Sequence, residues 1–502
     1  MKKHLLILTF LFAYCSYAQK SIVPTKNAQP SFLMADFLSV EMPKLDSGRV
    51  ERNMGIIGIH LNRTFNKYYV GLGMYGAVSG ERGGFFTLGL NAGYKFSIYK
   101  NLILDTGFHF GGGGGASTPD GGGAFILPHL NLGVEFKNIS VTTGYSYINF
   151  FDQGEIESHQ LNASIHIPLK INSASITAAQ KEYSLKDLQA SSWNTAPLEI
   201  SAMMHLNNLL LKKGKLSGKT IRLAGFEFNT YLDKNKFLFL KLDGAYHGIR
   251  AGYMDIILGT GYHISMNNNK TNVIGKLGIG AGGGGGVDTK GGFLIYPDLS
   301  IEQELSNNIF ISLNTGLLMS PNRHFESTNW GLGLKYYLKA NGVTDVSSTS
   351  TPIFKGVEVI LKQDLYIDAS RMTKNANDLY SISLQLNYQL NDRIYLAGQT
   401  AFANFRDGGA YAEGIVGIGW QTNYFANEKY NFFIQSLAGA AGGGGINTGQ
   451  GAIIKPSVGM NYKINSDLAF RGALGYIKSM GGGVSSPTIN IGLNCQLAFL
   501  KL

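Results

Sequence analysis

The chain has 502 residues, of which 44% are hydrophobic and 15% charged, with 66 glycines and a formal net charge of +10 at pH 7. Beyond residue 20 no run of 18 consecutive apolar residues occurs, which excludes a membrane-spanning helix there. The lysines are scattered through turns instead of gathering with aromatic residues, so the positive charge gives no reason to expect a nucleic-acid partner.

The first segment, residues 1–18, is predicted to be a secretory signal peptide. Lys2 and Lys3 form a basic start, residues 5–14 form a short apolar run, and small residues end it at Ala18. Lipidation at Cys15 is the weaker alternative, because the bulky Tyr14 precedes it. With the signal removed, only Cys495 remains, and no intramolecular disulfide can form.

Beyond the signal, residues alternate with period two. In 378–390, "DLYSISLQLNYQL", Tyr380, Ile382 and Leu384 point one way and Ser381, Ser383 and Gln385 the other. Such runs reach about ten residues, the length that a tilted strand needs to cross a membrane. The polar face is mainly Gly, Ser, Asn and Gln, with charges held back to the turns. The pattern predicts an all-β, antiparallel transmembrane barrel; a soluble sandwich or propeller would have shorter strands and more charge on its polar face.

The turns fall into two sets. Short turns are basic or rich in asparagine, as in "FNKYY" (65–69) and "LDKNKF" (232–237), whereas longer loops are rich in glycine, as in "GAVSGERGGF" and "GAYHGIRAGY". Membrane barrels have short periplasmic turns and longer outer loops. We therefore expect the glycine-rich loops to lie outside the cell.

An internal repeat runs through the chain. Three glycine runs, 111–115, 282–286 and 442–445, recur with similar surroundings. The predicted organisation is barrel repeat 1 at 19–171, a periplasmic connector at 172–196, repeat 2 at 197–339, a second periplasmic connector at 340–351, and repeat 3 at 352–502. Each repeat is predicted to have about eight strands.

Two architectures fit this repeat. One closes all the strands into a single barrel of about 24, and the other makes three tandem eight-stranded barrels. The long connectors favour three barrels. The small, hydrophilic polar face favours one wide, wet lumen, and we expect the single barrel.

The glycine runs are predicted to form outer hairpins, bounded by Gly111 and Gly115, Gly282 and Gly286, and Gly442 and Gly445. The glycines could let a strand coil or another backbone approach closely, or let the hairpins fold inward and narrow a pore. A third hypothesis is an anion contact at the pore mouth through Arg82, Arg250, Arg406, Thr118, Thr289 and Thr448. For the threonines, ordinary hairpin turns are the alternative.

No catalytic pattern is visible. None of the ten histidines recurs in all three repeats, and HExxH, GxSxG and CxxC motifs do not occur. We expect no enzyme activity, no catalytic residues, no cofactor and no metal site.

The ends of the chain carry a resemblance. The signal end "YAQK" and the closing strand "INIGLNCQLAF", with Gly492 and the late aromatic Phe499, resemble those of outer-membrane β-barrel proteins of the Bacteroidota; here Leu500, Lys501 and Leu502 follow the aromatic residue. The resemblance implies the cell outer membrane as location, and outer-membrane lipid and the barrel-insertion machinery as partners.

Two functions are predicted. The first is a channel or passive conduit whose outer mouth is shaped by the three glycine-rich hairpins. The alternative is a non-conducting surface or scaffold barrel that docks a protein or glycan partner through its extracellular loops.

Overall fold

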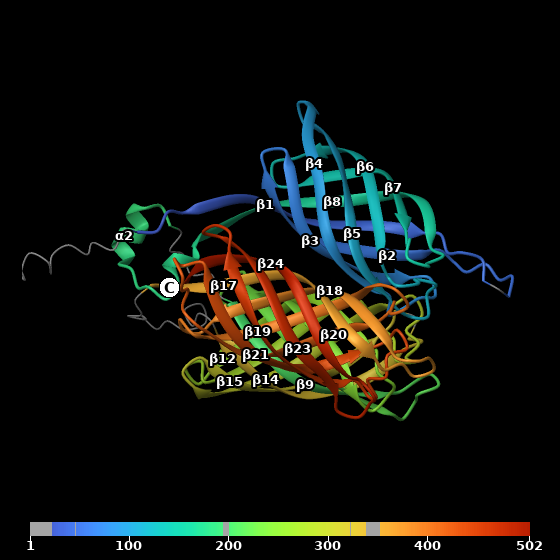
Figure 1. Cartoon of the computed structure of the whole chain (residues 1–502). Coiled ribbons are helices and arrows are strands. Elements are labelled where there is room, and N and C mark those ends of the chain that lie inside the picture. Colours follow the sequence, from blue (N-terminus) through green and yellow to red (C-terminus); the bar gives the residue numbers. More distant parts are fainter. Residues whose placement is uncertain (1–22, 46, 194–199, 322, 338–351, 502) are drawn as a thin grey trace, which may run out of the picture.

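A computed structural model describes residues 23–45, 47–193, 200–321, 323–337 and 352–501. The predicted signal peptide and the predicted connector 340–351 lie outside these residues. The described chain is almost entirely antiparallel β-structure, in three groups of eight strands that we call rings 1, 2 and 3 (Figure 1).

Ring 1 consists of β1 (Asn27–Val40), β2 (Met54–Phe65), β3 (Tyr68–Ser79), β4 (Phe86–Tyr99), β5 (Leu102–Gly114), β6 (Phe125–Glu135), β7 (Ser140–Asn149) and β8 (Glu157–Ser175). Ring 2 consists of β9 (Ile200–Leu211), β10 (Thr220–Tyr231), β11 (Lys236–His247), β12 (Met254–Met266), β13 (Thr271–Gly283), β14 (Phe293–Ser306), β15 (Ile309–Met319) and β16 (Glu326–Tyr337). Ring 3 consists of β17 (Ile353–Ala369), β18 (Asn377–Gln389), β19 (Ile394–Phe405), β20 (Ala412–Gln421), β21 (Tyr430–Gly442), β22 (Ala452–Lys463), β23 (Leu468–Ser479) and β24 (Ser485–Lys501).

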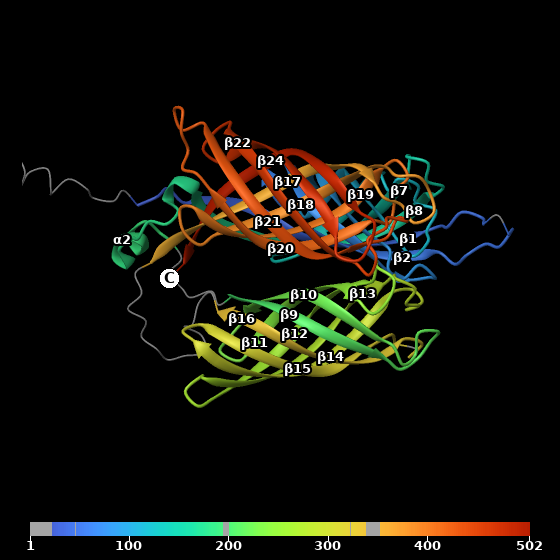
Figure 2. The same cartoon turned by 60° about the horizontal axis from the view of Figure 1, so that its bottom comes forward.

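Each ring closes on itself. The first strand pairs with the eighth in ring 1 (β1 with β8), in ring 2 (β9 with β16) and in ring 3 (β17 with β24). Ring 3 and ring 1 are also joined by a two-residue bridge, Ala498 to Ala174 and Leu497 to Ser175. The expected single barrel of about 24 strands is therefore wrong for the described residues, and the alternative of three eight-stranded barrels describes the structure. Figure 2 separates ring 3, in orange and red, from ring 2, in green and yellow.

The side chains inside the lumens explain why the prediction of a single wide barrel was wrong. An eight-stranded ring is just wide enough for side chains to fill it, and the inward positions carry large and charged residues instead of a thin hydrophilic lining. Tyr69, Tyr296, Tyr366 and Arg471 are among the largest fully buried side chains. In a wide barrel these side chains would face open water, whereas here each packs against other side chains inside its own narrow ring.

Charged residues occupy the middle of the lumens, contrary to the expectation that charges stay in the turns. In ring 2, Lys276 Nζ lies 2.8 Å from Glu227 and 3.2 Å from Asp298, which come from different strands. In ring 3, Lys455 Nζ lies 2.8 Å from Asp364 and 3.0 Å from Glu413. A buried charge is stable only when paired and hydrogen-bonded, so these ion pairs tie strands together across the lumens of rings 2 and 3.

Apolar side chains close the outer end of each lumen. Phe85, Phe125 and Phe150 are fully buried in ring 1, and the rings of Phe125 and Phe150 stack 4.9 Å apart. Comparable clusters include Leu223 and Tyr253 in ring 2. In ring 3 the cluster contains Leu379, Tyr411 and Val484. Hence each ring has an apolar plug at one end above a buried polar interior.

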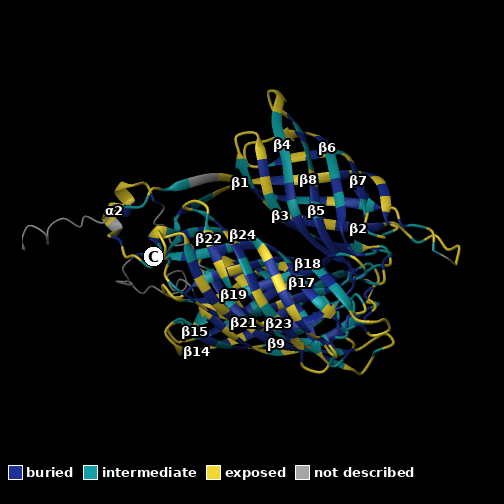
Figure 3. Ribbon diagram, viewed as in Figure 1, coloured by how far each residue is buried: buried dark blue, intermediate teal, exposed yellow. Residues whose placement is uncertain are grey.

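The outward faces are apolar. Alternating exposed and buried residues give each ring the checkered surface of Figure 3, and Leu258, Leu277 and Leu299 of ring 2 point outward and are exposed. Large exposed aromatic residues, including Phe65, Tyr68, Tyr99 and Phe136, lie beside the short turns. An apolar band with aromatic residues at its edge is the surface that a membrane barrel presents to lipid.

The predicted connector 172–196 is partly folded. Residues 172–175 continue β8, and a 3-10 turn (Ile176–Ala178) and a short helix α2 (Leu185–Ala190) follow. The Gln180 and Tyr183 N–H groups donate to the Phe354 and Pro352 carbonyls, at 2.7 and 2.9 Å. Figure 1 shows α2 and the start of β17 at the same end of the molecule, opposite the glycine-rich hairpins. This end also carries the short turns, which by the asymmetry of membrane barrels are expected on the periplasmic side, and we refer to it as the periplasmic end.

Candidate functional site

The three glycine-rich hairpins lie where the rings meet. The loop before β4 of ring 1 contacts the glycine run of ring 2, the loop before β12 of ring 2 contacts the run of ring 3, and the loop before β20 of ring 3 contacts the run of ring 1. The strand contacts follow the same order, β3 with β13, β11 with β21 and β19 with β5. Contacts that repeat head to tail and return to the start form a closed ring, so the chain is an internal pseudo-trimer.

Backbone packs directly against backbone at these contacts. A Cβ atom added on one side would lie too close to a backbone nitrogen of the next ring, at 2.5 Å from Gly84 to Gly284, 2.5 Å from Gly442 to Gly252 and 2.8 Å from Gly114 to Ala410. Gly84 and Gly252 also have φ values of +99° and +110°, which residues with side chains rarely adopt. The repeated glycines therefore let the three rings approach one another closely.

Hydrogen bonds accompany each contact. The Gly83 N–H donates to the Lys290 carbonyl at 2.8 Å, and the Gly248 N–H donates to Gln450 Oε1 at 2.9 Å. The Arg406 N–H donates to a carboxylate oxygen of Asp152. Polar backbone groups at the interfaces are thus paired between rings.

An apolar cluster joins the rings beneath the hairpins. Phe86 and Leu88 of ring 1, Ala281 of ring 2 and Phe402 of ring 3 are buried together, with Met254 of ring 2 packed against them. Because these residues come from all three rings, the cluster fills the space where the rings converge.

Two of the three predicted threonines close their own turns. Thr118 Oγ1 donates to the Gly115 carbonyl, and Thr289 Oγ1 donates to the Gly282 carbonyl at 2.7 Å. Thr448 is buried, and its Oγ1 has no hydrogen-bond partner among the described residues.

The predicted arginines are held separately. Arg82 pairs with Glu51, with Nε 2.7 Å from the carboxylate, and donates to the Ser117 carbonyl in the glycine-rich hairpin of the same ring at 2.6 Å. Arg406 lies 3.4 Å from Asp378. Arg250 Nη2 contacts Met372 Sδ at 3.5 Å. An anion site formed by the three together stays a prediction, and their present partners do not favour it.

Asp120 is a residue that the sequence did not single out. Its carboxylate accepts hydrogen bonds from the Gly115 N–H at 2.9 Å and from Thr118 Oγ1 at 3.2 Å. It packs against ring 3, since a Cβ atom on Gly409 would lie 2.6 Å from Asp120 Oδ1. Burial raises the pKa of Asp120 to about 7, although these hydrogen bonds and the charge of Arg82 oppose the shift.

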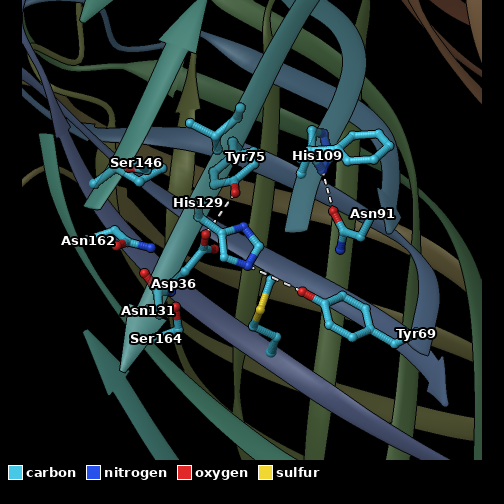
Figure 4. A pocket seen from close by; sticks show the side chains of 14 residues that line it. Asp36, Tyr69, Tyr75, Asn91, His109, His129, Asn131, Ser146, Asn162 and Ser164 are labelled. Carbon is cyan, nitrogen blue, oxygen red and sulfur yellow. Dashed lines mark hydrogen bonds between the residues drawn. The ribbon is translucent and has the colours of Figure 1, made fainter. Parts of the chain in front are cut away.

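Ring 1 encloses a small polar cavity of about 10 Å³. Figure 4 shows side chains from several strands turned toward one another there, including Asp36, Tyr75, Asn91 and His109. Tyr75 donates to Asp36 at 2.7 Å. The volume is near the minimum for one water molecule, so the cavity has no room for a substrate.

Among the described residues, no group of three or more His, Cys, Asp or Glu side chains is placed to hold a metal ion. In the same part of the chain, no helix is long and apolar enough to cross a membrane.

The chain is an outer-membrane β-barrel protein. Its antiparallel rings are closed, apolar toward the outside and polar within, and they join short turns at one end to longer loops at the other. This is the build of barrels that lie in the outer membrane.

Comparisons with known proteins add little to this. No protein-family model and no curated protein sequence matches the chain. A structural search finds the siderophore receptor PirA from Pseudomonas aeruginosa at 10% identity, covering 94% of this chain and 80% of that one, with a TM-score of 0.27. It also finds OpdQ from P. aeruginosa (7% identity, 94% and 98% covered, TM-score 0.20) and OccAB3 from Acinetobacter baumannii (11% identity, 94% and 100% covered, TM-score 0.20). At these TM-scores, the three-ring arrangement has to be judged from its own strand pairings.

Replacing Gly442 with alanine should weaken the contact between rings 2 and 3. The new methyl group would meet the backbone of Gly252, and overpacking of this kind costs about 1–3 kcal/mol. Urea unfolding of the protein in lipid vesicles, followed by tryptophan fluorescence, measures the change. Gly414→Ala is the matched control, because a Cβ atom there meets nothing within 4 Å; equal stability of the two variants would contradict tight packing at Gly442.

Asp120 should make the contact between rings 1 and 3 less stable as pH rises. The folded pKa of about 7 lies above the ordinary value of 3.8, so the folded state binds the extra proton between these values. The contribution is complete below about pH 4 and is lost as pH rises through about 7. In vesicle unfolding experiments across this range, the stability difference between wild type and Asp120→Asn should therefore change with pH; a constant difference would argue against the raised pKa.

Proposed function

We propose that the chain is a sealed, non-enzymatic outer-membrane protein that holds a negatively charged partner, an acidic glycan, at its outer face. The observation that supports a sealed protein is that two layers of side chains, one apolar and one polar, fill each lumen. The apolar plug, such as Phe85, Phe125 and Phe150 in ring 1, lies above a layer of buried polar side chains. A water-filled path through any ring would require both layers to move.

The outer loops of ring 2 support the second part. The β9–β10 loop, "KKGKLSGK" at 212–219, carries four exposed lysines: Lys212, Lys213, Lys215 and Lys219. Further basic residues in the outer loops of the same ring are Arg250, Lys290 and Arg323. The acidic residues at this end include Asp288 and Glu326, and Glu326 lies 3.1 Å from Lys213 and 3.2 Å from Arg323. A clustered positive field attracts anionic partners and speeds their association.

A passive conduit is the second candidate. In its favour, each ring is lined by polar side chains through the middle of its lumen, including Asn62, Lys276 and Asn461. Conduction would then follow from displacement of an outer plug. The Bacteroidota origin suggested by the chain ends stays a prediction, as does the use of the barrel-insertion machinery.

Purified full-length protein in planar bilayers should show no discrete conductance. Insertion is checked by the lower gel mobility that a folded barrel acquires on heating. Phe125→Ala with Phe150→Ala serves as the comparison because it removes the stacked aromatic pair of the ring 1 plug. Discrete conductance steps from the inserted wild type would contradict the sealed lumen and favour the conduit.

Replacing Lys212, Lys213, Lys215 and Lys219 with glutamine should weaken binding of a polyuronate probe to the protein in nanodiscs by about tenfold or more, and wild-type binding should fall steeply with salt. The matched control replaces Lys137 and Lys429, which lie in turns at the periplasmic end. An equal loss of probe binding in the control, or no loss of binding in the loop variant, would contradict the acidic-glycan proposal. Neither result would bear on the sealed lumen.

A further inference from the structure

A groove of about 730 Å³ opens on the outward wall of ring 2, across β12 to β15. All of its lining residues belong to ring 2. Ring 2 contacts ring 1 through β13 and β14 near the glycine-rich hairpins. The outward side chains that flank the groove, including Leu277 and Leu299, are exposed, so the groove lies within the apolar part of the membrane.

Small outward residues create the groove. Thr260, Gly275, Pro297 and Thr315 stand on four successive strands, and a Cβ atom added to Gly275 would meet nothing within 4 Å. Larger outward side chains flank them: Tyr262, Leu277, Leu299 and Leu317. The groove is therefore a dip between apolar side chains, and it includes Pro297, where the pairing of β14 with β15 passes from Ile295 and Met319 directly to Asp298 and Gly316.

The fold does not require this dip. Counted from the strand starts, Thr260, Gly275 and Thr315 correspond to Ile418, Ile434 and Leu474 of ring 3. These three residues point outward and are exposed. Ring 3 thus has a filled wall where ring 2 has a groove.

Positive charge lies at the periplasmic end of the groove. Lys236 lines it at the start of β11, and its side chain is 63% exposed, 3.8 Å from Asp233. Lys270 is exposed in the neighbouring short turn between β12 and β13. Next to Asp233, the ammonium group of Lys236 still has N–H donors that can bind a phosphate. The periplasmic end of the groove lies at the level of the inner-leaflet head groups.

We propose that this groove is a lipid site that holds an acyl chain of an anionic glycerophospholipid of the inner leaflet, with the phosphate at Lys236 and Lys270. The apolar walls bind the chain, and the lysines select the head group. The site depends on the membrane location of the chain and is independent of the proposed glycan partner.

The test is native mass spectrometry of full-length protein reconstituted in vesicles of phosphatidylethanolamine and phosphatidylglycerol and released in mild detergent. Wild type should retain one phospholipid, enriched in phosphatidylglycerol. Thr260→Ile, Gly275→Ile and Thr315→Leu together introduce the ring 3 residues and should lower the retained lipid by about tenfold, since two lost CH₂ contacts suffice for that factor.

Leu332→Ile is the control, because it changes an outward residue outside the groove and should not lower the retained lipid. If the triple variant does not fold, Gly275→Ile alone is used to fill the groove. Lys236→Gln with Lys270→Gln should keep the lipid but remove the preference for phosphatidylglycerol. Unchanged retention in a folded, filled variant would overturn the site. An unchanged preference in the lysine variant would overturn the head-group assignment.

Discussion

The structure depends on one constraint: in lipid, every backbone N–H and C=O must be hydrogen-bonded within the protein. This chain meets the constraint three times, because each group of eight strands pairs its first strand with its last. A ring of eight is narrow, so its inward side chains must touch one another. Polar groups that are buried in this way have to pair, and ion pairs such as Lys276 with Glu227 follow from the closure.

Three closed rings then face a second problem, because lipid is as apolar as their outer walls and gives little drive for association. Close packing and hydrogen bonds have to provide it. The glycine runs allow both, since without side chains the backbones at Gly442 and Gly252 come within contact distance. Each ring gives one loop and receives another, so the head-to-tail order closes without leaving an unmatched surface.

The alternation of residues predicted the strands closely: 378–390 was expected where β18 runs from Asn377 to Gln389. The repeat also predicted eight strands in each copy. The pattern could not show which strand β1 pairs with, because a strand in a ring of eight or of 24 alternates in the same way.

The role of the hairpins could not be predicted from the sequence either, because it depends on contacts between distant segments of the chain. Close backbone approach was one of three open interpretations, and the partner of each glycine run lies in another ring, far away in the chain. Charged lumen residues were misjudged because Lys276 and Glu227 stand singly among apolar neighbours on distant strands, β13 and β10, and meet only after closure. Their inward position in the alternating pattern was the signal that could have identified them.

Duplication leaves the three rings with the same closure and the same contacts, so a difference between them is not needed for the fold. Ring 2 differs in two places: its outer loop carries Lys212, Lys213, Lys215 and Lys219, and its lipid-facing wall has a groove where ring 3 is filled. Ring 1 differs in its lumen, where His60 and His109 stand near Asp36 without a buried lysine or arginine among the ring's described strands. Because the lumens are packed, differences inside them alter stability, whereas differences outside alter what the protein can touch. The specific chemistry of this chain is therefore best sought on the two surfaces of ring 2.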